Sequence, residues 1–273
     1  MQYYIIVKCV FSFEIRCNKI FLCTSLVYTL KSQNIQIMKS KLLILSGFLT
    51  LFFFSVNAVN FNGSGKIVSR VINVADFNSV VLASSANVEI SNSNTFSVVL
   101  TDYENLIDLY KFTKDNSTLT IGTKPNISIR NSVAKIKITV PGAFFSVKIS
   151  GSGDVKINNL NTIKELSVSG SGNISALTHE SYQDIKLHIS GSGRIKLNGV
   201  ANSTTVSVSG SGELYLDDLK SQTVDCKLSG SGKANVFAVK KLSVSLTGSG
   251  IIVYSGNPNI EKNIKGSGKL IRK

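Results

Sequence analysis

The segment "KISGSGDVKI" at residues 148–157 decides the fold, because close variants of it return through the second half of this 273-residue chain. The variants are "SVSGSGNISA", "HISGSGRIKL", "SVSGSGELYL", "KLSGSGKANV" and "SLTGSGIIVY". Successive Gly-Ser-Gly tripeptides from Gly151 to Gly266 begin 19, 21, 19, 20, 18 and 18 residues apart. A steady period of this length predicts a solenoid, in which stacked repeats share one core.

Apolar residues alternate with polar ones on both sides of each tripeptide. Val147 and Ile149 precede the first copy, and Val155 and Ile157 follow it, with Lys148 and Lys156 between them. A period of two predicts strands with one buried face, and no helical period separates the copies. We therefore predict an all-β fold, a parallel β-helix of about seven rungs, with its rungs about 4.8 Å apart.

The tripeptides are predicted to be the corners at which each rung bends from one strand into the next. Glycine tolerates a positive φ and lets neighbouring backbones approach closely, and the intervening serine hydroxyls are expected to form a hydrogen-bonded ladder. A phosphate-binding loop, by contrast, occurs once and before a helix. The corner glycines are Gly151, Gly153, Gly170, Gly172, Gly191, Gly193, Gly210, Gly212, Gly230, Gly232, Gly248, Gly250, Gly266 and Gly268.

The first 58 residues are predicted to be targeting and upstream sequence. Residues 38–58 have a Lys-bearing start, an apolar stretch and small residues at Val56 and Ala58, which is typical of a secretory signal peptide. The apolar stretch is shorter than the ~20 residues of a spanning helix, so contact with a membrane is expected only if this signal stays uncleaved. Residues 1–37 are interpreted as an upstream mis-start or leader. We expect an exported protein of the periplasm, cell surface or medium.

Residues 59–146 are predicted to form a strand-rich capping portion, followed by the repeat domain at 147–273. The segment "VVLASSANVEI" at 80–90 overlays a repeat, with residues 84–86 at the corner. "STLTIG" and "AKIKITVP" are predicted strands, and "DYENLIDLYKF" at 102–112 is the one predicted helix, with Asp102 as its cap.

Charge and cysteine content narrow the function classes. The net charge is +14, and residues 59–273 keep 24 basic against 15 acidic side chains. The basic residues are scattered, which argues against nucleic-acid binding. Cys226 is the only cysteine after the signal peptide; it is predicted to be a buried thiol, and no spacing suggests a metal or other cofactor.

The sequence offers little support for catalysis. Parallel β-helices also include lyases and glycosidases, so a polysaccharide-acting enzyme remains the alternative; a glycosidase needs two suitably spaced carboxylates. Asp217, Asp218 and nearby Asp225 are the one local acidic cluster, and adjacent strand residues face opposite ways. His179 and His188 are the only histidines, and His188 occupies an outward position. We predict no enzymatic activity.

A binding role is favoured, with Lys156, Lys196 and Tyr215 as the predicted binding face. The partner is left open between a glycan and a cell-envelope protein. Arg194, Glu213 and Lys233 are expected to lie on consecutive rungs, with opposite charges side by side. Self-assembly through the last rung, "GSGKLIRK", is a third class, which its Lys and Arg residues would oppose.

With these residues in hand, the chain resembles the putative autotransporter adhesin head GIN domain family over about residues 70–273. The likeness includes "TVPGAFFSVKISGSG" at 139–153, "LNGVANSTTVSVSGSGELYLDDL" at 197–219 and "YSGNPNIEKNIKGSGKL" at 254–270. This resemblance implies an exported bacterial β-helix protein with an adhesin-like surface role, and it implies no catalytic or ligand-binding residues.

Overall fold

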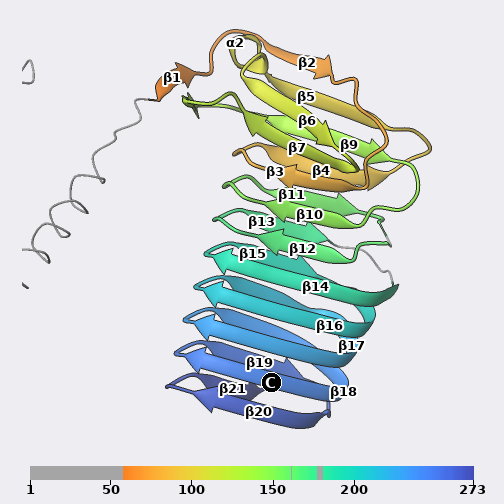
Figure 1. Ribbon diagram of the computed structural model, residues 1–273, viewed down its shortest axis with the longest axis vertical. Coiled ribbons are helices and arrows are strands. Elements are labelled where there is room, and N and C mark those ends of the chain that lie inside the picture. Colours follow the sequence, from red (N-terminus) through yellow and green to blue (C-terminus); the bar gives the residue numbers. More distant parts are fainter. Residues whose placement is uncertain (1–57, 161, 177–180) are drawn as a thin grey trace, which may run out of the picture. The chain divides into compact units, whose positions relative to one another are not determined.

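The computed structural model describes residues 58–160, 162–176 and 181–273, and their repeats form the predicted β-solenoid (Figure 1). Each rung contributes a strand to each of two ladders, which we call wall A and wall B. The seven corners delimit about six complete turns. Residues 1–37 and nearly all of the predicted signal peptide at 38–58 lie outside the described residues.

Wall A contains the strand that enters each corner, and all neighbouring strands in it are parallel. In stacking order its strands are β7 (Thr118–Thr123), β3 (Ser79–Leu82), β10 (Ser146–Ile149), β12 (Glu165–Val168), β14 (Ser181–Gly191), β16 (Gly199–Gly210), the later parts of β17 (Glu213–Gly230) and β18 (Lys233–Gly248), and β20 (Asn259–Lys265).

Wall B contains the strand that leaves each corner, again with parallel neighbours. Its strands are β9 (Lys135–Val140), β4 (Asn87–Asn92), β11 (Val155–Asn158), β13 (Asn173–Ala176), β15 (Arg194–Leu197), the first parts of β17 and β18, β19 (Ile251–Ser255) and β21 (Lys269–Arg272).

The core consists of apolar columns that the register aligns from rung to rung. Val147 pairs with Leu166, which pairs with Leu187, and each of these side chains is at most 1% exposed. Ile157, Ala176 and the following wall B residues continue in the same way. Burying aligned apolar side chains is the main favourable contribution to stability in such a stack. The alternation predicted from the sequence is therefore confirmed for these columns.

Two apolar positions after the corners depart from this inward pattern. Val200 and Val239 follow the pattern of Leu160 and Leu219, but they are 45% and 39% exposed, whereas the two leucines are buried. In β20 and β21 two inward columns change from uncharged to cationic residues. Lys262 is the register partner of Val244, and Arg272 is the register partner of Tyr254. Both cationic side chains are exposed.

The corners bring the backbones of successive rungs into direct contact. The Lys233 N–H donates to the Gly212 carbonyl at 3.0 Å, and the Ser231 N–H donates to the Gly210 carbonyl at 3.0 Å. A Cβ on Gly232 would lie 2.6 Å from the Gly212 carbonyl oxygen. Gly230, with φ of 113°, additionally needs the left-handed region.

The hydroxyl ladder expected of the corner serines forms at one step only among the described residues. Ser249 and Ser267 approach with their Oγ atoms 3.1 Å apart. At the other corners the rungs are joined by backbone hydrogen bonds, such as the Ser211 N–H donating to the Gly191 carbonyl at 3.0 Å. Backbone donors and acceptors must be paired in any case. Backbone hydrogen bonds therefore connect successive corners where hydroxyl pairs were expected.

The segment before the repeats adds rungs in an order that differs from the sequence. As predicted, β3 and β4 align with β10 and β11, with residues 84–86 at the corner. The rung of β7 and β9 then stacks on β3 and β4, although it comes later in the chain. Beyond β9, wall B continues with two antiparallel strands, first β5 (Ser97–Tyr103) and then β2 (Ile67–Val71). β6 (Tyr110–Asp115) pairs antiparallel with β7 of wall A. A separate parallel pair is formed by β1 (Val59–Asn62) and β8 (Ile127–Arg130).

The short helix is confirmed, but its length and cap differ from the prediction. α2 spans only Glu104–Ile107, and the rest of the 102–112 segment belongs largely to β5 and β6. Tyr103 occupies the N-cap position without a side-chain hydrogen bond, while Asp102 lies in β5 and is fully buried. No helix among the described residues has the length and apolarity to cross a membrane.

Gly232→Ala is expected to lower the free energy of unfolding by about 1–3 kcal/mol, because the added methyl meets a backbone carbonyl that cannot move alone. Chemical denaturation measures the change. Ser231→Ala, at the exposed neighbouring position, is the control and should change stability by no more than about 0.5 kcal/mol. Equal stability of both variants would contradict the close-approach explanation.

The Cys226 thiol is expected to resist modification in the native protein. Cys226 is buried, and burial raises its pKa to about 12, so little thiolate exists at pH 8. Ellman's reagent should react with this thiol at least about a hundredfold faster after denaturation. Rapid native labelling at Cys226, located by peptide mapping, would show that its rung opens or is misplaced.

Candidate functional site

The candidate site is the outward surface of wall B, where polar side chains form columns across the strands. In-register parallel pairing places side chains of equivalent position on neighbouring strands over one another. Because parallel strands are about 4.8 Å apart, each column repeats at that spacing. Strands also fix side chains more rigidly than loops do, which suits a binding surface.

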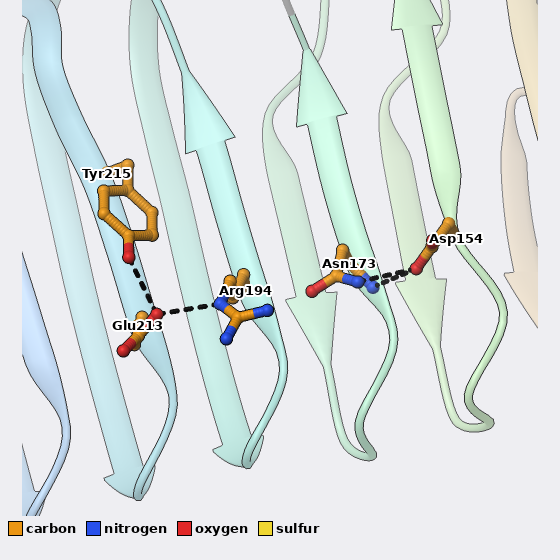
Figure 2. Close-up of polar contacts among 5 residues, drawn as sticks. All are labelled: Asp154, Asn173, Arg194, Glu213 and Tyr215. Atoms are coloured by element: carbon orange, nitrogen blue, oxygen red, sulfur yellow. Dashed lines mark hydrogen bonds and ion pairs between the residues drawn. The ribbon is translucent and has the colours of Figure 1, made fainter.

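The first column begins just after the corners and is held together by pairwise hydrogen bonds (Figure 2). The Asn173 Nδ2 donates to Asp154 Oδ1 at 2.8 Å, and the Asn173 backbone N–H donates to the same oxygen at 3.0 Å. Two rungs further, the Arg194 Nε donates to Glu213 Oε2 at 2.8 Å. The predicted adjacency of Arg194 and Glu213 is therefore confirmed, and the register also places Lys233 beside Glu213.

Tyr215 is oriented by the same carboxylate. Its hydroxyl donates to Glu213 Oε2 at 2.8 Å, so the ring is fixed across the face of β17 (Figure 2). The hydrogen bond from Arg194, followed by the one from Tyr215, lowers the pKa of Glu213. The hydrogen bond to Glu213 in turn raises the pKa of Tyr215. Tyr215 is therefore a neutral, positioned phenol at physiological pH.

The predicted binding residues share the second outward column, but they are not immediate neighbours. The register runs from Lys156 through Ser175 to Lys196, then to Tyr215 and Asn235. Lys196 thus lies beside Tyr215, whereas Lys156 is separated from Lys196 by one strand. The three residues lie on one wall and point outward.

A groove of about 560 Å³ lies over β9, β4, β11 and β13. Lys156 lines it, together with Lys135 and Lys137 from β9, while Lys196 and Tyr215 lie outside its lining. Neither Lys135 nor Lys137 could be assigned to this surface from the sequence pattern. "AKIKITVP" indicated a strand with outward lysines, but nothing local indicated that this strand stacks next to β4.

The carboxylates considered for catalysis are divided between different surfaces and have other partners. Asp217 on wall B accepts from Asn235 Nδ2 at 2.9 Å and from Lys273 Nζ at 3.1 Å. Asp225 belongs to wall A, 3.8 Å from the Lys227 ammonium, and Asp218 is exposed at the bend between the walls. Within residues 58–160, 162–176 and 181–273, no cluster of three His, Cys, Asp or Glu side chains is placed to hold a metal ion. His188 lies on wall A, and His179 is outside the described residues.

A buried polar cluster near the first rungs was also missed from the sequence. Asp102 is fully buried, and its Oδ2 accepts from the Tyr110 hydroxyl at 2.9 Å and from Ser132 Oγ at 2.7 Å. Backbone N–H groups of Tyr103 and Val133 donate to Oδ1 at 2.8 and 3.0 Å. These bonds fasten β5, β6 and the loop after β8 to one another, which gives Asp102 a structural role. Burial raises the pKa of Tyr110 well above its usual range.

Together, the two parallel walls and their outward columns define the class: a β-solenoid protein that presents rows of polar side chains on an extended surface. Residues 76–258 match the family described as "Putative auto-transporter adhesin, head GIN domain". The match covers more than half of the chain, and the protein belongs to this family.

Solved structures share the fold. A putative adhesin from Bacteroides fragilis NCTC 9343 is 24% identical with a TM-score of 0.68, over 78% of this chain and 100% of that chain. A putative lipid binding protein from Parabacteroides distasonis ATCC 8503 is 27% identical with a TM-score of 0.64, over 78% and 99% of the two chains. A putative adhesin from Parabacteroides merdae ATCC 43184 is 22% identical with a TM-score of 0.61, over 79% and 100%. No curated protein matches the chain.

The Glu213 carboxyl is expected to titrate below its usual pKa of 4.5 in the folded protein, and Arg194→Gln should raise this pKa. A lowered folded-state pKa means that ionised Glu213 stabilises the fold above pH 4.5 and that this contribution is lost as the pH falls through the lowered value. NMR titration of the Glu213 side chain measures both values. Lys148→Gln on wall A is the control, and an equal response to both substitutions would disprove the local pairing.

Proposed function

We propose that the protein is an exported, adhesin-like binding protein that engages its partner through wall B and has no catalytic activity. Membership of the adhesin head family supports a surface or extracellular role. In this proposal residues 38–58 direct export, residues 59–146 cap the stack, and residues 147–273 present the binding wall.

The observation that carries the proposal is the second column of wall B. Lys156, Ser175, Lys196, Tyr215 and Asn235 occupy five successive strands, and each places a polar side chain in the same outward column. An extended ligand lying across the strands would meet one such group per strand, about every 4.8 Å. This geometry suits a chain-like glycan or an extended segment of a cell-envelope protein.

The described surface gives less support to the other candidate classes. Hydrolysis by a carboxylate pair needs two acidic groups that converge on one bond, and Asp217 and Asp225 lie on different walls. Lipid binding, for which one structural relative is named, calls for an apolar surface or cavity. The groove of wall B is instead rimmed by lysine, glutamate, aspartate, asparagine and serine side chains, and its aliphatic residues, Val88, Ile136 and Val155, are at most 2% exposed.

The test is a glycan array and a cell-envelope pull-down with the full chain and two triple variants. Replacing Lys156, Lys196 and Tyr215 by alanine should weaken retention of the partner about tenfold or more, since clustered central residues supply most binding energy. The matched control replaces Lys148, His188 and Lys227, which share one outward column of wall A.

The control variant should retain the partner, and circular dichroism should show that both variants are folded. Equal retention by both variants would exclude wall B as the binding face. Turnover of a polysaccharide by the unmodified protein would instead establish the enzymatic alternative.

A further inference from the structure

The four carboxylates on wall B already have hydrogen-bond partners within the protein. Glu89 accepts from Asn158 Nδ2 at 2.8 Å, and Asp154 accepts from Asn173. Glu213 accepts from Arg194 and Tyr215, and Asp217 accepts from Asn235 and Lys273. Each acidic group is thus engaged in the architecture of the wall.

Several lysines of the same wall have no such partner, among them four that lie on β9, β11 and β15. Lys135, Lys137, Lys156 and Lys196 are exposed, and no carboxylate of the described residues lies within 4.0 Å of their ammonium groups. Three of them, Lys135, Lys137 and Lys156, line the groove of about 560 Å³. The unengaged charge of wall B is therefore positive.

The register spaces three of these lysines evenly. Lys137 on β9, Lys156 on β11 and Lys196 on β15 share one column, with Glu89 and Ser175 on the intervening strands. Lysines therefore recur at every second strand, which corresponds to roughly 10 Å. An extended polysaccharide built of two-sugar repeats, with one acidic group per repeat, carries charges at a comparable interval.

Wall A also carries basic side chains, and two of its lysines are paired with acidic ones. The Lys241 ammonium lies 2.8 Å from Glu261, and the Lys227 ammonium lies 3.8 Å from Asp225. Lys186 is the register neighbour of Glu165. Lys148 and Lys265 have no acidic register neighbour, so wall A is basic as well. What distinguishes wall B is the groove, which brings Lys135, Lys137 and Lys156 together.

We propose that wall B binds a linear anionic glycan that runs across the strands, with acidic groups on alternate sugars paired to Lys137, Lys156 and Lys196. Lys135 would assist at the groove, and Ser175, Tyr215 and Asn235 would contact sugar hydroxyls. This inference rests on the proposed function, since it names the ligand class for the same wall.

The surface favours a glycan over a membrane or a protein partner. Membrane-bound surfaces combine cations with apolar anchors that enter the lipid, and protein interfaces usually centre on large apolar or aromatic side chains. On β9, β4, β11, β13 and β15, no large apolar side chain of the described residues is exposed. Amide, hydroxyl and ammonium groups, which match sugar hydroxyls and acidic substituents, predominate there instead.

The test measures binding of the full chain to four immobilised polysaccharides by biolayer interferometry. The probes are hyaluronate, with one carboxylate per disaccharide; polygalacturonate, with one per sugar; dextran sulfate, with dense sulfates; and uncharged dextran. The variant Lys137→Gln/Lys156→Gln/Lys196→Gln is compared with the charge-matched control Lys148→Gln/Lys186→Gln/Lys227→Gln on wall A. Thermal melting shows whether both are folded.

We expect hyaluronate to bind the unmodified protein more tightly than the other probes do, with an affinity that falls as salt rises, because salt screens exposed charges. The wall B variant should lose about tenfold or more in affinity, and the control should lose about twofold or less. Preference for dextran sulfate would assign the anionic site to sulfate-bearing chains and overturn the alternate-carboxylate assignment.

Equal losses in both variants would overturn the proposal by showing that only net charge matters. So would equal binding of dextran and hyaluronate, or the absence of binding to every anionic probe. If the array still shows a neutral glycan that depends on Tyr215, the proposed function stands and only the ligand class is wrong. If wall B substitutions change no binding at all, the proposed function fails as well.

Discussion

The close approach of successive backbones at the corners is the constraint on which the structure depends. Where a side chain would begin on Gly232, the carbonyl oxygen of Gly212 in the preceding rung leaves no room, and the same oxygen accepts a hydrogen bond from Lys233. One contact therefore excludes a side chain and also satisfies the backbone. Since it recurs from Arg194 to Lys269, it sets the position at which the strands of wall A end and those of wall B begin in the repeats.

Alignment at the corner determines which side chains of neighbouring strands share a column, on both surfaces of each wall. A shift of one residue would exchange the buried and exposed faces of a strand, so the inward apolar columns and the outward polar columns are fixed together. Arg194 meets Glu213 because their strands leave equivalent corners. Surface pairs of this kind add little stability, about 0–1 kcal/mol. Their effect is to engage the acidic side chains, while Lys137, Lys156 and Lys196 have no ion-pair partner among the described residues.

The features that follow from local periodicity could be predicted from the sequence: the strands, most of the inward columns, the burial of Cys226 and the neighbouring positions of Arg194 and Glu213. Features that depend on contacts distant in sequence could not. The rung of β7 and β9 stacks on β3 and β4 out of chain order. The position of Lys137 beside Glu89 could therefore not be predicted from the sequence. Asp102 looked like a helix cap because its partner Ser132 lies 30 residues away. Corner hydroxyls were expected to pair, but the backbone already occupies that role.

The charges at the inward positions of β20 and β21 bear on a hazard common to layered parallel sheets, which is growth into fibres. An exposed sheet edge is a template for further strands, and every earlier rung of this stack offers an apolar layer to the next one. The layer with Lys262 and Arg272 differs, because another molecule seated on it would have to bury an ammonium and a guanidinium group without counter-charges. Lys262 and Arg272 therefore oppose the stacking of a second molecule on this layer, although the fold itself gains stability from stacked repeats.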